Sequence, residues 1–484
     1  MARRFGILQA AVRDEPSAVA PARSGRAKLL TMLPFALGRP YHRCRAQGGK
    51  RVSPDLGETN KETPVVSRAR TREPPMTLTN IDVLVSGASV AGPTLAYWLH
   101  RHGFNPTVVE RTPFLRKGLG GHAVDLFGPA VDVADWMGVL PEVLAARTQT
   151  ERLSFERPGK SPVEVDLSRL VAGISDRHVE IMRGELASIL YEASRDHVEY
   201  VFGDSIRTLD EDSDGVKVTF ERGAPRRFGL VVGADGLHSN VRRLTFGDES
   251  RFRRYIGGYL AFFTVPNYLG LEGRMITYVA PGKLAAMYPV RQTGEARAGF
   301  LFRRIEELAY DYRDIEQQKR LLREEFAGDG WEVPRLLDEL EHVTDLYFDS
   351  ISQIIMDTWS SGRVTLVGDA GYSPGPAVGG GTSVAFVGAY VLAGELREAG
   401  GDHTTGLRNY ENQMQEFVRR SRAIGPTTMK TLIPRTPLQV WLTPQLMRLV
   451  PRLPVTLQQR LSSLQGGPAA ALDSITLKRY EPIR

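Results

Sequence analysis

Cysteine is almost absent from this sequence, since Cys44 is the only one among 484 residues. A single cysteine cannot form an intrachain disulfide, which excludes a disulfide-stapled scaffold and favours a reducing, cytoplasmic compartment. Long apolar runs are also lacking: no stretch reaches the roughly 18 uninterrupted apolar residues that a membrane helix needs. With 42% hydrophobic and 24% charged residues, the composition is typical of a soluble globular protein of two or three domains.

Negative charge is scarce only at the N-terminus. Residues 1–75 contain 15 Lys and Arg against 6 Asp and Glu, whereas residues 76–484 contain 47 against 50. The folded body is therefore slightly acidic, which argues against a nucleic-acid partner, because such binding needs positive charge on a folded face. We expect residues 1–75 to be a disordered basic extension, or upstream sequence before a true start at Met76. A transit peptide and a nucleic-acid-binding arm are the alternatives for this segment.

A dinucleotide-binding pattern opens the rest of the chain. A β-branched stretch at residues 81–85 is followed by a turn containing Gly87, Ser89 and Gly92, then by a helical stretch and a second strand ending in Glu110. This order predicts a βαβ unit whose helix N-terminus faces a pyrophosphate, with the acid on an adenosine ribose. The serine replaces the usual middle glycine, so its hydroxyl would donate to phosphate. The same turn would also suit an unrelated α/β protein.

Two further strand ends carry an acid. One reads LVVGADG and contains Asp235 and Gly236, and the other reads VTLVGDA and contains Asp369. The second continues through Pro376 and Gly379–Gly381 into an apolar helix. Ligands bind at the carboxyl ends of strands in open α/β sheets, so both acids are candidate ligand contacts. Taken singly, each segment is also explained as an ordinary turn.

The segments between these motifs predict antiparallel strands. Residues 275–280, 284–290 and 298–303 alternate in the manner of a meander, and residues 152–167 in the manner of a hairpin. His122 and the aromatic side chains near these strands belong either to the sheet core or to a substrate pocket. Those aromatic residues are Tyr255, Tyr259, Phe262, Phe263, Tyr278, Tyr288, Phe300 and Phe302.

Together, the motifs GxSxxG, GADGxxSxVR and GDAxxxxxPxxGxG, in this order, resemble the class A FAD-dependent monooxygenases of the para-hydroxybenzoate hydroxylase type. The resemblance is strongest to the branch that contains tetracycline-modifying monooxygenases, and it spans about residues 79–484. The segment Ile181–Leu186 is similar to the family segment whose arginine, here Arg183, approaches the FAD. The sequence departs from the family pattern in two places: Gly371-Tyr372 replaces the common Ala-His, and Gly388 replaces an acid.

The resemblance implies an α/β fold in which a Rossmann-like FAD-binding domain is interleaved with an antiparallel-sheet substrate domain and followed by C-terminal helices. The expected FAD-binding domain is discontinuous and comprises residues 79–150, 175–250 and 345–400. The expected substrate domain comprises residues 151–174 and 251–344, and the C-terminal helical region comprises residues 401–484.

The resemblance also implies the cofactor contacts. Backbone N–H groups of Gly379–Gly381 would face the flavin N1–C2=O edge, Asp125 would lie near the flavin, and Lys117 would bind an NADPH phosphate. No catalytic side chain or metal cluster is expected, because the cofactor carries the chemistry. The full set of expected cofactor-binding residues is Gly87, Ser89, Gly92, Glu110, Arg111, Lys117, Asp125, Arg183, Asp235, Gly236, Asp369, Pro376, Gly379, Gly380 and Gly381.

The activity that the resemblance implies is hydroxylation of an aromatic, phenolic or polyketide-like small molecule by a monomer or homodimer. FAD would be the cofactor, NADPH or NADH the reductant and O₂ the oxidant, with a flavin C4a-hydroperoxide as the oxygenating species. One alternative is a flavin reductase or halogenase of the same fold, and the lack of a Trp-x-Trp-x-Ile-Pro segment argues against the halogenase. The other is a non-catalytic flavin- or substrate-binding protein, which only the departures at Tyr372 and Gly388 support.

Overall fold

The computed structural model describes residues 78–115, 121–157, 159–167, 177–376, 379–449 and 471–480. The expected N-terminal extension and the candidate phosphate contact Lys117 lie outside the described residues.

A six-stranded sheet forms the core of one half of the molecule. Its strands lie in the order β17-β18-β11-β1-β2-β7, and all neighbours are parallel except β17 and β18. Residues 83–85 of the central strand β1 are fully buried, as expected for a parallel strand covered on both faces. The strands are β1 (Asp82–Ser86), β2 (Asn105–Glu110), β7 (Glu199–Phe202), β11 (Leu230–Gly233), β17 (Ser360–Ser361) and β18 (Val364–Leu366).

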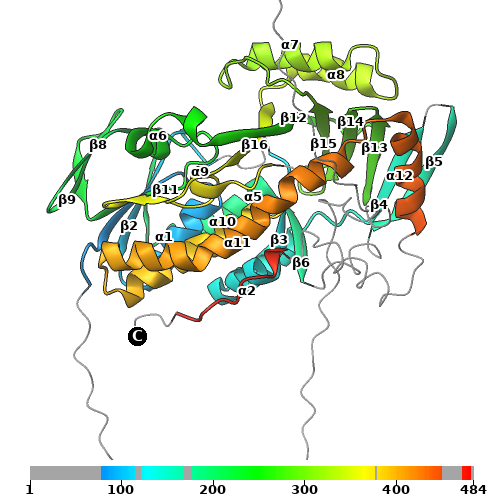
Figure 1. The fold of residues 1–484 in the computed structure, drawn as a ribbon. Coiled ribbons are helices and arrows are strands. Elements are labelled where there is room, and N and C mark those ends of the chain that lie inside the picture. Colours follow the sequence, from blue (N-terminus) through cyan, green and yellow to red (C-terminus); the bar gives the residue numbers. More distant parts are fainter. Residues whose placement is uncertain are drawn as a thin grey trace, which may run out of the picture.

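Helices cover this sheet. Helix α10 (Gly381–Glu398) packs between α1 (Ala91–Arg101) and α11 (His403–Leu432), as Figure 1 shows. A three-stranded sheet of β8 (Ile206–Asp212), β9 (Gly215–Phe220) and β10 (Arg226–Phe228) contacts β11. The remaining elements of this half are α2 (Gly128–Met137), α3 (Leu140–Ala145), α5 (Arg183–Glu192), α6 (Asn240–Phe246), η1 (Glu249–Arg251) and α9 (Asp369–Tyr372).

A seven-stranded sheet forms the other half, in the order β16-β12-β15-β14-β13-β4-β5. The predicted meander and hairpin are both confirmed as parts of it. Helices α7 (Ile315–Phe326) and α8 (Val333–His342) cover one face and share its aromatic core (Figure 1). The strands are β4 (Arg152–Arg157), β5 (Lys160–Asp166), β12 (Arg253–Val265), β13 (Arg274–Ala280), β14 (Lys283–Val290), β15 (Glu295–Arg303) and β16 (Tyr347–Ile354).

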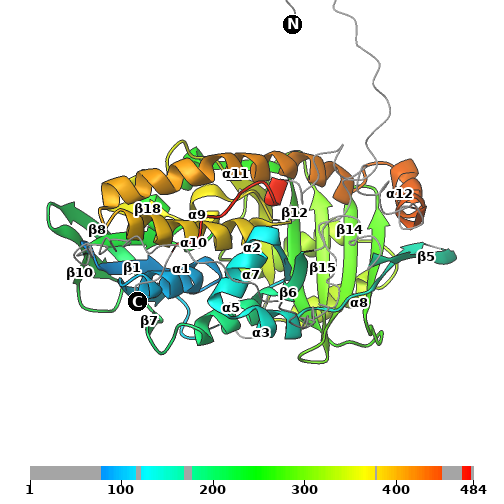
Figure 2. The same ribbon diagram turned by 90° about the horizontal axis from the view of Figure 1, so that it is seen from below.

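A short antiparallel pair, β3 (Ala123–Phe127) with β6 (His178–Met182), connects the two halves. Strand β3 contacts α10, while Ala123 and Met182 share a hydrophobic cluster with residues of β12 and β14. Helix α11 also runs between the halves, contacting both α10 and β12 (Figure 2). Helix α12 (Pro437–Leu449) packs on β5 and β13. The β3–β6 pair thus lies where the half with the six-stranded sheet meets the seven-stranded sheet.

Strand β16 lies inside the segment 345–400, which the sequence analysis assigned to the FAD-binding domain. It pairs along its length with β12 of the seven-stranded sheet. Almost every one of its side chains is buried there. The division of the chain into domains stays a prediction. Among the described helices, none combines the length and the apolar character needed to cross a membrane.

Candidate cofactor site

A cavity lies where the N-terminal ends of α1 and α10 meet the β3 strand and the first residue of β16. It encloses about 900 Å³, including open space at its mouth. The residues predicted to bind a cofactor that line this cavity are Ser89, Asp125, Arg183, Gly236, Asp369, Pro376, Gly379, Gly380 and Gly381. They come from five separate stretches of sequence, so the fold brings together most of the predicted set.

The two helices that begin at the cavity have no side-chain cap from their own N-cap residues. Neither Val90, which precedes α1, nor Gly380, which precedes α10, makes a side-chain cap, and neither helix has an acid in its first turn. The first N–H groups of a helix lack intrahelical partners and carry the positive end of the helix dipole. Two such ends on one cavity form a site suited to an anionic ligand.

A guanidinium group adds full positive charge to the same wall. Arg183, the first residue of α5, donates from Nε and Nη2 to the Ser89 hydroxyl at 3.3 and 3.1 Å. The Asp369 carboxyl lies close by. Burial raises its pKa, although a hydrogen bond from Ser373 and the charge of Arg183 oppose that rise. Serine in place of the middle glycine therefore gives the arginine a hydrogen-bond partner at the turn.

Two predicted glycines, Gly87 and Gly92, do not line the cavity. A Cβ atom on Gly87 would lie 2.6 Å from the Ala234 carbonyl oxygen, and one on Gly92 would lie 1.9 Å from the Gly87 carbonyl oxygen. Gly87 also has a φ of +109°. These residues must be glycine because the turn packs tightly between β11 and α1, whatever ligand it faces.

Asp235 also lies outside the cavity wall, unlike its neighbour Gly236. Its buried carboxylate accepts hydrogen bonds from the Ser239 hydroxyl at 2.5 Å and from the backbone N–H groups of Asn240 and Val241 at 2.9 and 3.1 Å. Burial raises its pKa, against these hydrogen bonds. The acid of this motif holds the turn and the start of α6 in place.

Glu110 and Arg111 end the second strand beyond the cavity wall. The Glu110 carboxylate accepts hydrogen bonds from the backbone N–H groups of Ala88, at 2.8 Å, and Thr112, at 2.9 Å. It therefore ties the end of β2 to the glycine-rich turn, while Arg111 is exposed to solvent. Their contacts with an adenosine stay predictions.

The seven-stranded sheet contributes an aromatic wall to the cavity. The His122 ring stacks on Phe262 with centroids 5.0 Å apart and lies 5.8 Å from the ring of Tyr347. His122 and Tyr347 both line the cavity. Burial, helped by the charge of Arg183, lowers the pKa of His122 to about 3, so its imidazole is neutral. The sequence left His122 ambiguous and gave no signal for Tyr347, because only the pairing of β16 with β12 brings that residue here.

Of the eight aromatic residues near the predicted meander, all of which are described, none lines the cavity. Most are sheet core: the Phe300 ring, for example, packs edge-on against Phe326 of α7 with centroids 4.8 Å apart. A contact between these aromatic residues and a substrate stays a prediction.

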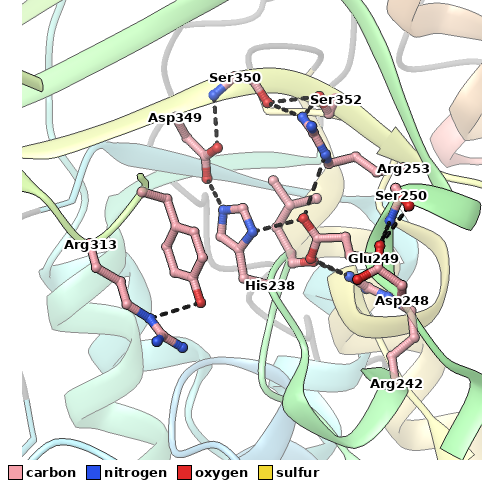
Figure 3. A network of polar contacts seen from close by, with 12 residues as sticks. His238, Arg242, Asp248, Glu249, Ser250, Arg253, Arg313, Asp349, Ser350 and Ser352 are labelled. Atoms are coloured by element: carbon pink, nitrogen blue, oxygen red, sulfur yellow. Dashed lines mark hydrogen bonds and ion pairs between the residues drawn. The ribbon is translucent and has the colours of Figure 1, made fainter. Parts of the chain in front are cut away.

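A network of charged side chains contacts the turn that follows the cavity residue Asp369, and Figure 3 shows this network. The fully buried Arg242 donates to the Ala370 carbonyl oxygen at 2.8 Å and to Glu249 at 2.7 Å. His238 lies between Glu249, at 3.0 Å, and Asp349 of β16, at 3.3 Å. Burial would lower the pKa of His238, yet its bonds to the two carboxylates raise it to about 9. The network joins the GADG and GDA motifs to the seven-stranded sheet.

The two departures from the family pattern lie together in the core. A Cβ atom on Gly388 would lie 2.1 Å from the Tyr372 hydroxyl oxygen. That hydroxyl hydrogen-bonds to the Tyr410 hydroxyl at 2.8 Å, which in turn donates to the Leu366 carbonyl at 3.0 Å. Neither departing residue lines the cavity. The missing side chain at Gly388 leaves space for the Tyr372 hydroxyl, so the two departures compensate for each other in the packing of the core.

Comparisons with known proteins bear on the family and the fold. The FAD binding domain family matches residues 80–423. A flavin-dependent monooxygenase of Legionella longbeachae is 39% identical over 346 residues, covering 72% of this chain and 88% of that protein. An uncharacterized protein of Mycobacterium tuberculosis is 48% identical over 342 residues, covering 70% of this chain and 91% of that protein. The crystal structure of tetracycline destructase Tet(55) has a TM-score of 0.71 and 36% identity, covering 84% of this chain and 100% of that one.

The chain therefore belongs to the FAD-binding-domain family and is a class A flavin-dependent monooxygenase. The α/β fold class and the family that the motifs predicted are both confirmed. The roles of individual residues toward the cofactor stay predictions.

Proposed function

We propose that this enzyme uses NADPH or NADH and O₂ to hydroxylate a small aromatic, phenolic or polyketide-like molecule. One observation carries the proposal: the cavity has an anion-binding wall of helix N-termini and Arg183 on one side, and an aromatic wall with His122 and Tyr347 on the other. The first wall suits the cofactor and the second a flat, hydroxylated substrate. The tetracycline destructases among the structural relatives, whose names state their substrate, support this choice of class.

The residues around the cavity fit FAD. The α1 N-terminus, Ser89 and Arg183 would hold its diphosphate, and the α10 N-terminus with Gly379–Gly381 would meet the flavin edge where negative charge develops on reduction. When bound, FAD supplies hydride acceptance and the activation of O₂. The protein supplies the charge complementarity and the walls that keep water out.

His122 is the residue best suited to orient a phenolic substrate. Its neutral ring has a buried Nδ1 atom with no hydrogen-bond partner among the described residues. A buried polar atom without a partner is costly, so a substrate hydroxyl bonded there would be favoured. Stacking on Phe262 fixes the plane of the ring. His122 would thus bind and orient the substrate without becoming charged.

The experiment uses the purified full-length protein. Its visible spectrum is recorded, and NADPH and O₂ consumption are then followed with a panel of phenols, naphthols and tetracyclines. We expect a yellow protein and at least one compound that accelerates NADPH consumption and yields a product one oxygen atom heavier. That atom should come from labelled O₂. Tight flavin binding with no compound-dependent oxygen incorporation across the panel would contradict the proposed function.

A variant tests the assignment of His122. The substitution His122→Phe keeps the stack on Phe262 and removes the ring nitrogens. We expect KM for a phenolic substrate to rise about tenfold, the equivalent of one hydrogen bond, with the bound FAD content unchanged. The control is His100→Phe, at an exposed histidine near the end of α1. An unchanged KM in the first variant would remove His122 from substrate binding.

A further inference from the structure

Two acids and a histidine form a buried cluster directly behind the cavity wall. Asp125 of β3 lies opposite Glu180 of β6 in the strand register. His178, two residues before Glu180, contacts the Asp125 carboxylate through Nε2 at 2.7 Å. The side chains of Asp125 and His178 are only 4% and 3% exposed, and Glu180 is equally buried. The cluster therefore has almost no access to water to stabilise its charges.

His178 is the one basic side chain that contacts this carboxylate pair among the described residues, and it carries charge only when protonated. Within the described residues, neither makes an ion pair with a lysine or arginine. The groups that face Glu180 are Asp125, His178, the Thr148 hydroxyl, which donates to it, and Tyr288 from β14. Burial first, and then the charge of Asp125, raise the pKa of Glu180 to about 7, against the opposing effects of Thr148 and His178. Two buried carboxylates this close cannot both be ionised without a large cost.

The cluster is rigidly connected to the cofactor cavity. Asp125 itself lines the cavity. Its backbone oxygen accepts a hydrogen bond from the Ser383 hydroxyl at 3.0 Å, and the same hydroxyl accepts one from the Phe127 N–H at 3.0 Å. Ser383 lies in the first turn of α10, the helix whose N-terminus faces the cavity. Negative charge that develops in the cavity therefore acts on the cluster across a single strand, which these hydrogen bonds hold in place.

We propose that Asp125, His178 and Glu180 form a proton-holding site, which takes up one proton from solvent when negative charge develops in the cofactor cavity and releases it when that charge is removed. The proposal rests on the proposed function in that it needs FAD to be reduced in this cavity. The hydride donor supplies both electrons, and the only bond made in the cluster is an O–H bond on the carboxyl pair. Asp125 lines the cavity, whereas His178 and Glu180 are positioning residues that act through it.

The test counts protons taken up when the bound FAD is reduced. The FAD-loaded full-length protein is titrated anaerobically with dithionite, in weak buffer containing a pH-indicator dye, between pH 6 and 9. Proton release from dithionite is common to all variants and cancels in the differences. If reduction raises the proton affinity of the cluster tenfold, proton uptake by the wild type should exceed that of Glu180→Gln by about half a proton per FAD near pH 7.5. Bleaching of the flavin is followed separately.

Two further variants keep the test decisive. Asp132→Asn, on the neighbouring helix α2 and in an exposed ion pair with Arg177, should match the wild type. Thr148→Val removes a donor that lowers the pKa of Glu180, so the excess uptake should move to higher pH, even if Glu180→Gln retains too little FAD to measure. Equal proton uptake at every pH in the wild type and Thr148→Val, with the flavin bound and bleached, would overturn this inference alone. A protein that binds no FAD would overturn the proposed function as well.

Discussion

Two histidines in this molecule each lie against a pair of carboxylates, yet the two clusters hold charge in opposite ways. His238 lies between Glu249 and Asp349 behind the GADG motif, and burial combined with these acids leaves its pKa raised to about 9. His178 lies against Asp125, beside Glu180, and there an acid has the perturbed pKa, raised to about 7. In the first cluster the raised pKa is that of the histidine, and in the second it is that of a carboxyl group.

The two clusters differ in whether arginine side chains lie close to their carboxylates. Arg242 and Arg253 both lie within ion-pair distance of Glu249, and they help His238 lower the pKa of that acid although burial opposes the change. The Glu249 side chain is also 26% exposed. The Asp125–Glu180 pair is almost fully buried and has no neighbouring arginine among the described residues, so only His178 and protonation of a carboxyl group can relieve its charge. Histidine, aspartate and glutamate therefore form a fixed ion-pair network around His238 and a titrating site around Glu180.

The largest expected effect comes from breaking the first cluster at its arginine. Arg242→Leu leaves two backbone carbonyls without their donor and removes the fully buried ion-pair partner of Glu249. We expect the free energy of unfolding to fall by about 3–5 kcal/mol, as for other half-removed buried ion pairs. Urea denaturation monitored by circular dichroism measures it, with Arg243→Leu, at an exposed neighbour, as the control. A loss under about 1 kcal/mol would mean that the network contributes no net stability.

The charge on His238 predicts a pH dependence. Its pKa is higher in the folded state, so its contribution to stability is complete below the ordinary value of 6.5 and is lost as pH rises through about 9. The contribution near pH 7.5 should be about 2 kcal/mol. Unfolding free energies of the wild type and His238→Gln, measured from pH 6 to 10, should therefore converge at the alkaline end. Parallel curves would show that His238 is not charged in the folded state.

Glu180 should show its pH dependence in a lower window. Its raised folded pKa means that ionisation costs stability, starting above the ordinary value of 4.5 and reaching its full extent above about 7. Glu180→Gln, which cannot ionise, should gain on the wild type by about 2 kcal/mol between pH 5 and pH 8. The same denaturation series measures this difference. A constant difference across this range would place the proton elsewhere in the cluster.

The smallest effect sharpens the comparison by leaving both clusters intact. Asp132→Asn removes an exposed ion pair with Arg177, whose side chain is 45% exposed. We expect a change of about 0.5 kcal/mol or less, because solvent already screens such pairs. A larger loss, seen in the same urea titration, would mean that the β3–β6 pair depends on the surface charge around it.

The sequence predicted those parts of the fold that local rules govern. Gly87 and Gly92 could be recognised because a steric requirement within one turn demands glycine, and the meander because alternation is visible within each strand. Long-range pairing could not be recognised. Nothing near Asp125 in the chain indicates His178, which is 53 positions away, and nothing near Tyr347 indicates the cavity. Asp235 was predicted as a ligand contact from its motif, but only the folded turn reveals the hydrogen bonds that its carboxylate accepts.

The contact between Tyr372 and Gly388 also constrains the history of the sequence. A side chain at position 388 and a tyrosine at position 372 cannot coexist in this core, because the first Cβ atom would overlap the hydroxyl group. We therefore expect a change from histidine to tyrosine at position 372 to require glycine at position 388. Descendants that keep the tyrosine cannot regain the acid. We expect relatives with tyrosine at the first position to have glycine at the second, so the pair marks a lineage within the family.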